Sequence, residues 1–420
     1  MNEQGEAATR LQDLIGPNGA AAAGDDVVQR ALEAVRTHLG LQVAYVSEFV
    51  GNETVFRHVD APGLAHLIKP GDSKSLDDVY CRHILAGRLP ELIADTADVP
   101  LAMAMPITHA VPIGTHVSVP LRMSDGEIYG MFCCLGPFAD KSLNNRDLGM
   151  MRAFADITAY EIEKQRDAGR VHREKEARIE AVVAHGGIGI VYQPIWSLAD
   201  NRPIGFESLS RFTAQPVRPP DQWFGEAADV GRGVELELLA IRHALANISA
   251  FPEDVYVSVN AASATVLSPQ LAELLDGRPL DRIVLEITEH DCIDDFEALE
   301  EALAPLRARG LRVAVDDAGA GHSGLQQILK MRPDLIKLDR SLIEGIGEDP
   351  GRRALAAALT MFARETGSRL IAEGVETETE LAMLRALGME KVQGYLLGRP
   401  VPLAAALELV ATPVACREVA

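Results

Sequence analysis

The sequence of 420 residues is short of cysteine, of basic residues and of long apolar runs, and each shortage excludes a class of protein. Five cysteines are too few for a disulfide framework, so the sequence predicts a protein of a reducing compartment. The first residues include acidic side chains and no apolar core, unlike a signal peptide. No run of about 18 apolar residues occurs, so we expect no membrane insertion. Together these features predict a cytoplasmic location.

The shortage of basic residues also restricts the partners. The chain has 40 Lys and Arg against 61 Asp and Glu, a formal net charge of -21. Because binding to nucleic-acid polymers depends on a basic surface, no such partner is predicted. A phosphorylated substrate would need metal ions to offset the repulsion. Apolar residues are plentiful, at 47%, and the length predicts two or three domains.

Eight short apolar runs in the second half of the chain each lead to a polar or ionisable residue. Stretches with helical spacing of apolar residues separate most of these runs. Such alternation predicts a parallel sheet with right-handed crossovers, and eight units predict an α/β fold, a (β/α)8 TIM-like barrel. The runs end at Gln193, Glu207, Asn260, Glu286, Asp316–Asp317, Lys337, Glu373 and Gln393. Since active sites of these barrels lie at the C-terminal strand ends, the set predicts a metal-dependent hydrolase.

Glu207, Leu209 and Arg211 alternate along one run and therefore share one face of the predicted strand. A carboxylate for a cation and a guanidinium for a phosphate would lie side by side there. Asn260 follows another strand and opens into small polar residues. Its amide is either a neutral metal ligand or the cap of the next helix.

The adjacent acids Asp316 and Asp317 form the most informative local motif. On a straight strand they would face opposite ways, but Gly319 and Gly321 allow the chain to turn at once. The pair can then serve two metal ions about 4 Å apart. The alternative is an ordinary turn, because Asp-Asp before glycine is common in turns.

Three more positions carry expectations for the predicted barrel mouth. Lys337 lies inside an apolar run, where a charge needs a partner, and Asp339 follows it on the same face. Gly394, after Gln393, is expected to let a ligand approach closely. Glu289 lies in the loop after Glu286 and is expected to anchor neighbouring backbone.

The first half of the chain predicts an α+β domain. The expected elements are a helix over 27–39, strands over 41–50 and 54–60, a hairpin over 116–136 with an Asp-Gly turn, and a long helix from about 145. This layout, with the hairpin VSVPL…GEIYGMFCCLG, resembles the GAF sensory domain over residues 24–163. The resemblance implies a pocket for an unknown small ligand or chromophore, or dimerisation.

The cysteines of this GAF-like domain leave alternatives open. Cys81 and His83 suit a chromophore or haem, or else they are a buried thiol and an ordinary histidine. Cys133 and Cys134 lie in a predicted strand, where packing is the simpler explanation.

The remaining segments complete the domain organisation. Residues 1–23 predict a flexible N-terminus and residues 412–420 a C-terminal tail. Residues 164–186 are dense in charge and predict a helical linker, either a solvated spacer or a helix that transmits a signal. The barrel is expected over 187–411.

The second half of the chain resembles the EAL phosphodiesterases. The motifs that carry the resemblance are YQPI, ESLSR, SVN, EITE, DDAGAG, KLD, AEGVE and QGYLLGRP. The resemblance implies a barrel with one strand reversed, commonly a homodimer. It also implies hydrolysis of cyclic di-GMP to linear pGpG with Mg²⁺ or Mn²⁺, two ions per site, under control of the N-terminal sensor.

The resemblance also assigns roles to matching residues. One metal ion would be held by Glu207, Asn260, Glu286 and Asp316. Asp316, Asp317 and Glu373 would serve the second ion or its bound waters. The catalytic residues would be Glu207, Asp317, Lys337 and Glu373, with Lys337 orienting the attacking water. Substrate would be contacted by Gln193, Leu209, Arg211, Asp339 and Gln393. Glu289 would stabilise the loop after Asp317.

Two motifs depart from the family pattern. The usual Glu-Ala-Leu is Glu207-Ser208-Leu209, and the usual Asp-Asp-Phe-Gly-Thr-Gly is DDAGAG, followed by His322. Every expected ligand remains, so an active phosphodiesterase is the main hypothesis. The alternative is a non-catalytic cyclic di-GMP receptor, which would bind the nucleotide without turnover.

Overall fold

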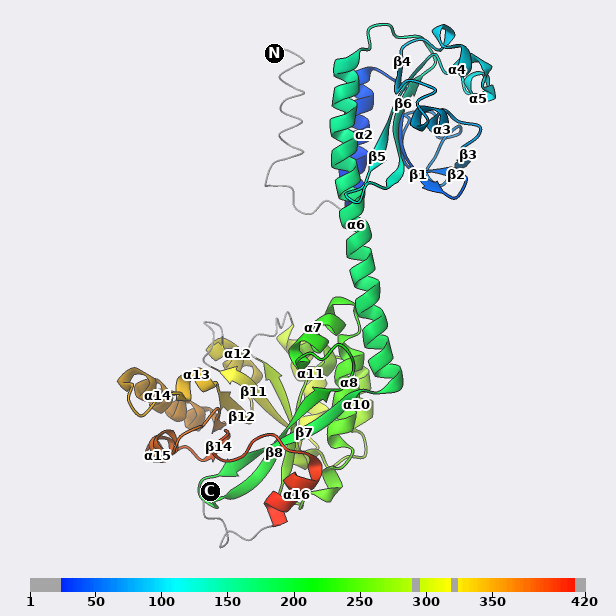
Figure 1. Cartoon of the computed structure of the whole chain (residues 1–420). Coiled ribbons are helices and arrows are strands. Elements are labelled where there is room, and N and C mark those ends of the chain that lie inside the picture. The colour runs from blue at the N-terminus through cyan, green and yellow to red at the C-terminus, as the bar shows by residue number, and fades with distance from the viewer. Residues whose placement is uncertain (1–23, 289–294, 319–323, 412–420) are drawn as a thin grey trace. The chain divides into compact units, whose positions relative to one another are not determined.

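The computed structural model describes residues 24–288, 295–318 and 324–411. The chain divides into two compact units with the boundary between Val171 and His172 (Figure 1). None of the helices in these described ranges has the length and apolarity needed to cross a membrane.

The first unit is built on a six-stranded antiparallel sheet with the strand order β3-β2-β1-β6-β5-β4. Its strands are β1 (Val43–Val50), β2 (Glu53–Asp60), β3 (Ser73–Ser75), β4 (Leu92–Ile93), β5 (Thr115–Arg122) and β6 (Ile128–Gly136). The predicted hairpin is confirmed as β5–β6, and Gly126 in its turn has a φ of +88°. The α+β fold class is confirmed.

Helices cover both faces of this sheet (Figure 1). The helices are α2 (Gly24–Leu39), α3 (Tyr80–Leu85), α4 (Pro100–Ala104), α5 (Pro106–Ala110) and α6 (Asn145–His185). Apolar residues of α2 and of the first part of α6 pack on one face, with Cys134 among them. The short helices α3 to α5 pack on the other face, with Cys133. Strand alternation therefore separates two adjacent cysteines into two cores.

Helix α6 contains 41 residues and includes the predicted linker without a break. Ion pairs between residues three apart, Glu161–Lys164 and Asp167–Arg170, lie along its exposed middle. Its last turns belong to the second unit, where Ile179 and Val182 are buried against α7.

The second unit is a closed eight-stranded barrel with the order β10-β11-β12-β13-β14-β7-β8-β9. Its strands are β7 (Ile188–Ser197), β8 (Arg202–Phe212), β9 (Tyr256–Asn260), β10 (Ile283–Thr288), β11 (Arg312–Ala318), β12 (Leu335–Leu338), β13 (Arg369–Ala372) and β14 (Lys391–Val392). β7 is antiparallel to both neighbours, and all other pairs are parallel. The expected barrel with one reversed strand is confirmed, and the reversed strand is the first.

Helices surround the barrel. They are α7 (Pro220–Asp229), α8 (Gly233–Leu245), α9 (Ser263–Val266), α10 (Pro269–Leu275), α11 (Phe296–Arg307), α12 (Gly324–Met331), α13 (Arg340–Ile343), α14 (Pro350–Thr366), α15 (Glu378–Ala386) and α16 (Leu403–Ala411). Their apolar faces pack with the outward-facing strand residues in one large core.

The barrel interior has an apolar layer that supports a polar one. The buried residues of the apolar layer are Ile195, Tyr256, Val284, Ala314, Leu335 and Ile371. Glu286, Lys337 and Glu373 each follow a member of this layer by two residues, so they also face inward. The alternation of the strands therefore places the polar side chains together at the barrel mouth.

Two of the predicted strand ends are wrong. β7 continues beyond Gln193 to Ser197, and β8 continues beyond Glu207 to Phe212. The two residues are cross-strand partners in the β7–β8 ladder. Because β7 runs against its neighbours, this long pair extends past the mouth and brings both side chains to it from mid-strand.

Candidate active site at the barrel mouth

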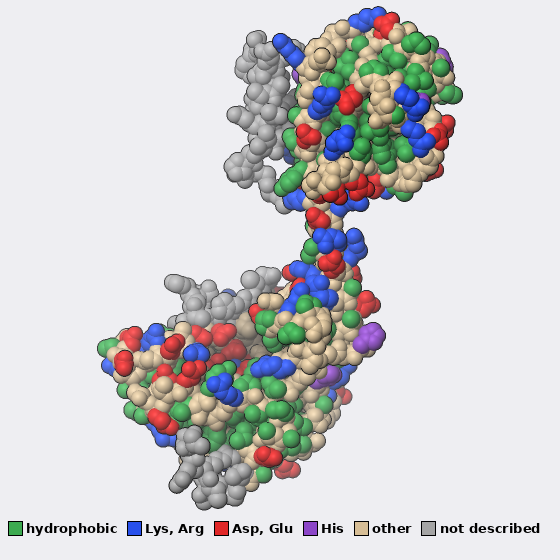
Figure 2. Space-filling model, viewed as in Figure 1, with side chains coloured by type: hydrophobic (Ala, Val, Ile, Leu, Met, Phe, Trp, Pro, Cys, Tyr) green, Lys and Arg blue, Asp and Glu red, His purple; other side chains and the backbone are tan. Residues whose placement is uncertain are grey.

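Lys337 lies at the centre of the polar layer, and its side chain is only 1% exposed. Carboxylates from four different strands or strand ends surround it. Its Nζ atom lies 2.7 Å from Glu373, 2.9 Å from Glu286, 3.1 Å from Asp316 and 3.6 Å from Glu207. In the space-filling view, acidic side chains gather in a hollow of this unit near β11 and α12 (Figure 2).

The carboxylates form two overlapping groups in which ligand atoms lie within 4.8 Å of one another. The first group consists of Glu207, Glu286 and Asp316. The second consists of Asp316, Asp317 and Glu373, so the two groups share Asp316. The site thus contains five carboxylates and one ammonium group, because Asp317 joins the four partners of Lys337 through the second group. Clusters of this composition suit hard divalent cations.

Glu286 supplies a direct test of whether a cation fits. One of its oxygens accepts a hydrogen bond from Lys337, at 2.9 Å. The other, Oε1, is buried and has no hydrogen-bond partner within the described part of the chain. A buried carboxylate oxygen without a partner is costly. A divalent ion would satisfy it, so the residues present fit a metal.

The pKa values follow from the same geometry. Burial alone would lower the pKa of Lys337, but the surrounding carboxylates outweigh it and raise the pKa well above its usual value. Burial raises the pKa of Glu286 to about 8, with Lys337 opposing the shift and the neighbouring acids adding to it. Burial likewise raises the pKa of Glu373. A bound cation would compete with these protons.

The adjacent acids meet because of the backbone of Asp317. Its φ is +59°, in the left-handed region that few residues other than glycine adopt. The β11–β12 register is irregular between Val315 and Ala318. The turn predicted at Gly319 and Gly321 thus begins earlier, at Asp317 itself, and those glycines lie outside the described residues.

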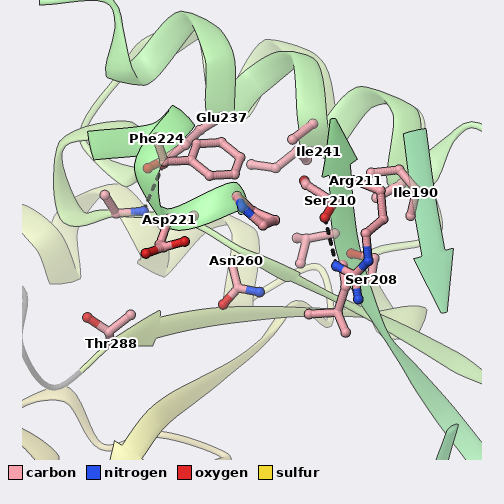
Figure 3. Close-up of a pocket in the computed structure, with 17 residues that line it drawn as sticks. Ile190, Ser208, Ser210, Arg211, Asp221, Phe224, Glu237, Ile241, Asn260 and Thr288 are labelled. Atoms are coloured by element: carbon pink, nitrogen blue, oxygen red, sulfur yellow. Dashed lines mark hydrogen bonds between the residues drawn. The ribbon is translucent and has the colours of Figure 1, made fainter. Parts of the chain in front are cut away.

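A cavity of about 420 Å³ opens beside this cluster, between β8, β9, α7 and α8 (Figure 3). Asn260, at the end of β9, and Asp221, from α7, point into it. Arg211 also lines it, with one guanidinium nitrogen donating to the Ser210 carbonyl at 2.8 Å. Glu237 accepts a hydrogen bond from the Ala262 backbone at 2.9 Å.

A second cavity, of about 210 Å³, lies on the other side of Leu209, which lines both. The predicted residues Gln193, Glu207, Glu373 and Gln393 line it. Gln393 donates a hydrogen bond to Glu207 at 2.5 Å and so fixes the orientation of this carboxylate. The two cavities therefore share Leu209 as a wall, and the pair is called the groove below.

The structure gives other roles to two expected residues. Asp339 is the N-cap of α13, where its side chain accepts a hydrogen bond from the Ser341 backbone at 2.9 Å. Gly394 is required by packing, since a Cβ there would lie 2.1 Å from the Val375 carbonyl oxygen. Gly394 also lines the second cavity, so the expectation that it lets a ligand approach closely stays a prediction. Glu289 and His322 lie outside the described residues.

Sequence reasoning missed several residues of the groove. Asp221 and Phe224 line the first cavity, and Arg340, Glu376 and Tyr395 line the second. Arg340 and Glu376 form an ion pair at 2.9 Å. Tyr395 directly follows the predicted Gln393-Gly394 motif, so the sequence could have indicated that it lines the site. No sequence feature indicates Asp221, because only the packing of α7 on the barrel brings it to the mouth.

Fold and site together define a (β/α)8 barrel with a reversed first strand and an acidic mouth suited to divalent cations. Comparison with family models names this class. The EAL domain model matches residues 176–400, more than half of the chain, and the GAF domain model matches residues 24–162. The chain belongs to the EAL domain family and carries a GAF domain before its barrel. Both expected resemblances are confirmed.

Curated relatives include signalling proteins and phosphodiesterases. An uncharacterized signaling protein of Caulobacter vibrioides is 29% identical over 331 residues, which cover 76% of this chain and 39% of that protein. Cyclic di-GMP phosphodiesterase NbdA of Pseudomonas aeruginosa is 30% identical over 249 residues, 56% of this chain and 32% of that protein. Probable cyclic di-GMP phosphodiesterase PdeD of Escherichia coli is 29% identical over 220 residues, which cover 50% of this chain and 41% of that protein. The chain spans less than half the length of these three relatives.

Solved structures agree with the fold. The PaMucR phosphodiesterase in its c-di-GMP complex has 25% identity and a TM-score of 0.50, covering 56% of this chain and 99% of that one. The EAL enzyme Bd1971 in its cAMP- and cyclic-di-GMP-bound form has 18% identity and a TM-score of 0.55, and the match covers 88% of this chain and 93% of that one. The second likeness shows the fold alone.

Proposed function

We propose that this chain is a cyclic di-GMP phosphodiesterase that hydrolyses its substrate to linear pGpG. The observation that carries the proposal is the set of five carboxylates at the barrel mouth, four of them around Lys337, arranged in two groups that share Asp316. Relatives named as cyclic di-GMP phosphodiesterases, at about 30% identity, support the substrate class.

The residues that would hold divalent ions, Mg²⁺ or Mn²⁺, follow from the two groups. Glu207, Glu286 and Asp316, with Asn260, would hold one ion, and Asp316, Asp317 and Glu373 a second. The chemistry that such ions supply is ionisation of water near neutral pH and neutralisation of phosphate charge.

The side chains of the mouth would position the reactants. Lys337 has three donor hydrogens and lies between Glu286 and Glu373, so it would orient the attacking water toward the phosphorus. Gln393 holds Glu207 in place. The substrate, with two nucleotide halves, would lie over Leu209 with one half in each cavity. Arg211 and Arg340 would then face its phosphates from opposite sides.

The test is product formation by the purified chain with cyclic di-GMP and Mn²⁺ or Mg²⁺, followed by chromatography. Glu207→Gln removes one metal-ligating charge at nearly constant shape. Glu301→Gln is the matched control, because Glu301 is exposed on α11. We expect pGpG from the unchanged chain and the control but not from Glu207→Gln. Tight binding without product in all three would support the receptor alternative instead.

We propose further that the GAF domain regulates the barrel through α6 and α7. Within the second unit, Arg178 of α6 pairs with Glu226 of α7 at 3.0 Å, and Ile179 and Val182 are buried in a cluster with Trp223. Residues of the same α7 line the first cavity. A displacement of the end of α6 would therefore move a wall of the groove.

Glu226→Gln tests this route, because Glu226 holds Arg178 and Arg218 together. We expect a change of about threefold to tenfold in the KM for cyclic di-GMP. Glu301→Gln, on the exposed face of α11, removes a carboxylate that belongs to neither helix and should leave KM unchanged. Equal effects of both substitutions would contradict a specific role for the α6–α7 contact.

Three properties implied by the family resemblance belong to the same proposal. They are homodimerisation, a cytoplasmic location and an effector of the GAF domain. Sedimentation velocity of the purified chain tests the first directly, and a monomer at all accessible concentrations would contradict it.

A further inference from the structure

A cluster of polar side chains lies in the apolar core of the first unit, on the face of the sheet that α3 to α5 cover. Its centre is Cys133 of β6, whose side chain is fully buried. Ser118 is its cross-strand partner on β5, and the Ser118 Oγ atom lies 3.1 Å from the Cys133 sulfur. Cys81, on α3, is 1% exposed and hydrogen-bonded to Cys133. Two thiols from distant parts of the chain therefore meet in a closed site.

His116 completes the cluster. It is 2% exposed and hydrogen-bonded to Cys133, while its Nδ1 has no hydrogen-bond partner among the described residues. The edge of its ring packs against Tyr80, with ring centroids 4.9 Å apart. A buried histidine nitrogen without a partner is costly, so it marks this site as a polar cluster rather than ordinary apolar packing.

The two thiols differ in acidity. The hydrogen bond that Cys81 donates to Cys133, together with burial, raises the pKa of Cys81 well above its usual value. Burial opposes ionisation of Cys133, but hydrogen bonds from Cys81, His116 and Ser118 outweigh it and lower its pKa. These hydrogen bonds favour the thiolate of Cys133 over that of Cys81.

We propose that Cys81 and Cys133 are a redox pair that a small peroxide converts to a disulfide. The Cys133 thiolate attacks one peroxide oxygen and breaks the O–O bond. This gives a sulfenic acid on Cys133 and a hydroxide, which takes up the proton that Cys133 lost on ionisation and leaves as water. The Cys81 sulfur then attacks the sulfenic sulfur, the S–O bond breaks, and the departing hydroxide takes the Cys81 proton and leaves as the second water.

The electrons and atoms of this sequence balance. Two thiols lose two electrons and two protons, and one hydrogen peroxide becomes two waters. The burial of both sulfurs selects a small uncharged oxidant over a bulky charged disulfide. Cysteine burial also normally suppresses reactivity, so the hydrogen bonds around Cys133 are the feature that sets it apart.

Cys134 provides a matched control inside the same strand. It is as buried as Cys133 but lies on the opposite face of the sheet, among the residues of α2 and α6. Burial raises its pKa well above the usual value. Any general accessibility of the β6 sulfurs to peroxide would oxidise both residues alike.

The experiment treats the native full chain with graded hydrogen peroxide, blocks the remaining thiols and maps each cysteine by mass spectrometry. The variants are Cys81→Ser, Cys133→Ser and the control Cys134→Ser. We expect a Cys81–Cys133 cross-linked peptide from the unchanged chain and from Cys134→Ser, reversed by a dithiol. In Cys81→Ser, the sulfenic acid on Cys133 should persist and react with dimedone. In Cys133→Ser, Cys81 should stay reduced.

Cys133 should react at least about tenfold faster than Cys134 in the unchanged chain. Equal rates at the two positions would overturn the proposal, as would survival of both thiols until the chain unfolds. These outcomes do not depend on hydrolysis of cyclic di-GMP, so the thiol chemistry and the phosphodiesterase proposal can fail separately.

Discussion

The barrel buries two lysines near opposite ends of its strands, and their surroundings have opposite charge. Lys337 lies among carboxylates, the nearest at 2.7 Å. Lys391, the first residue of β14, lies 5.4 Å from the centre of the Tyr256 ring. Arg312 lies over the same ring at 4.6 Å. One lysine is the minority charge of an acidic site, and the other is one of several cations.

The pKa values record this difference. Carboxylates raise the pKa of Lys337 despite its burial. Burial, together with Arg312 and Arg369, lowers the pKa of Lys391 to about 8. The same side chain in the same fold thus holds its proton tightly at the mouth and weakly at the other end. The comparison teaches that neighbours, more than burial, decide what a buried lysine does here.

The largest expected effect is that of Lys337→Met. Hydrolysis of cyclic di-GMP should fall by about a thousandfold or more, because the water-orienting group is lost. Without divalent ions, leaving the carboxylates uncompensated should cost about 3–5 kcal/mol of unfolding free energy. Lys391→Met is the control, with no loss of hydrolysis rate. Kinetics and urea denaturation measure both, and similar rates for the two variants would remove Lys337 from the mechanism.

The next effect is the pH dependence of the metal-free protein. The raised pKa of Glu286, about 8, means that the folded state keeps a proton that the unfolded state releases near pH 4.5. The stability contributed by this group is therefore complete below about pH 4.5 and is lost as pH rises through 8. Glu286→Gln should remove this part of the slope in denaturation curves with chelator present. An unchanged slope would refute the assignment.

Lys391 predicts a slope of the opposite sign. Its folded-state pKa of about 8 lies below the ordinary value of 10.5, so the unfolded state binds the extra proton between these values. Stability should rise with pH across this window, by about 3 kcal/mol at most. Denaturation of the unchanged chain and of Lys391→Met at pH 8 and pH 10 measures it. The variant should lack the rise.

The smallest effect separates two roles for Asp339. As the N-cap of α13, it should tolerate Asn, which caps equally well, while Asp339→Ala should cost about 1 kcal/mol. If Asp339 instead contacts the substrate, its charge matters, and Asp339→Asn should raise the KM for cyclic di-GMP. Stability and KM measured on both variants distinguish the roles.

The sequence predicted the inward-facing acids and Lys337 because they follow a simple rule. Glu286, Asp316, Lys337 and Glu373 each lie two residues beyond an apolar position that fills the barrel, so strand alternation alone brings these four together. The family resemblance implied one reversed strand without saying which one, and the structure identifies it as β7.

What the sequence did not predict depends on tertiary packing. The left-handed backbone of Asp317 is a local irregularity with no composition signal. Asp221 reaches the mouth only because α7 packs there. The cations around Lys391 come from strands that are distant in sequence and adjacent only in the closed barrel. The meeting of Cys81 and Cys133 depends in the same way on how α3 packs on the sheet.

The most direct test of the central claim is the formation of pGpG by the unchanged chain in chelator and in increasing Mn²⁺. An acidic mouth that needs cations predicts no product in chelator and a rate that rises with Mn²⁺ until both groups of ligands are filled. Equal product formation in chelator would contradict the account, because the carboxylates would then have a purpose other than holding metal.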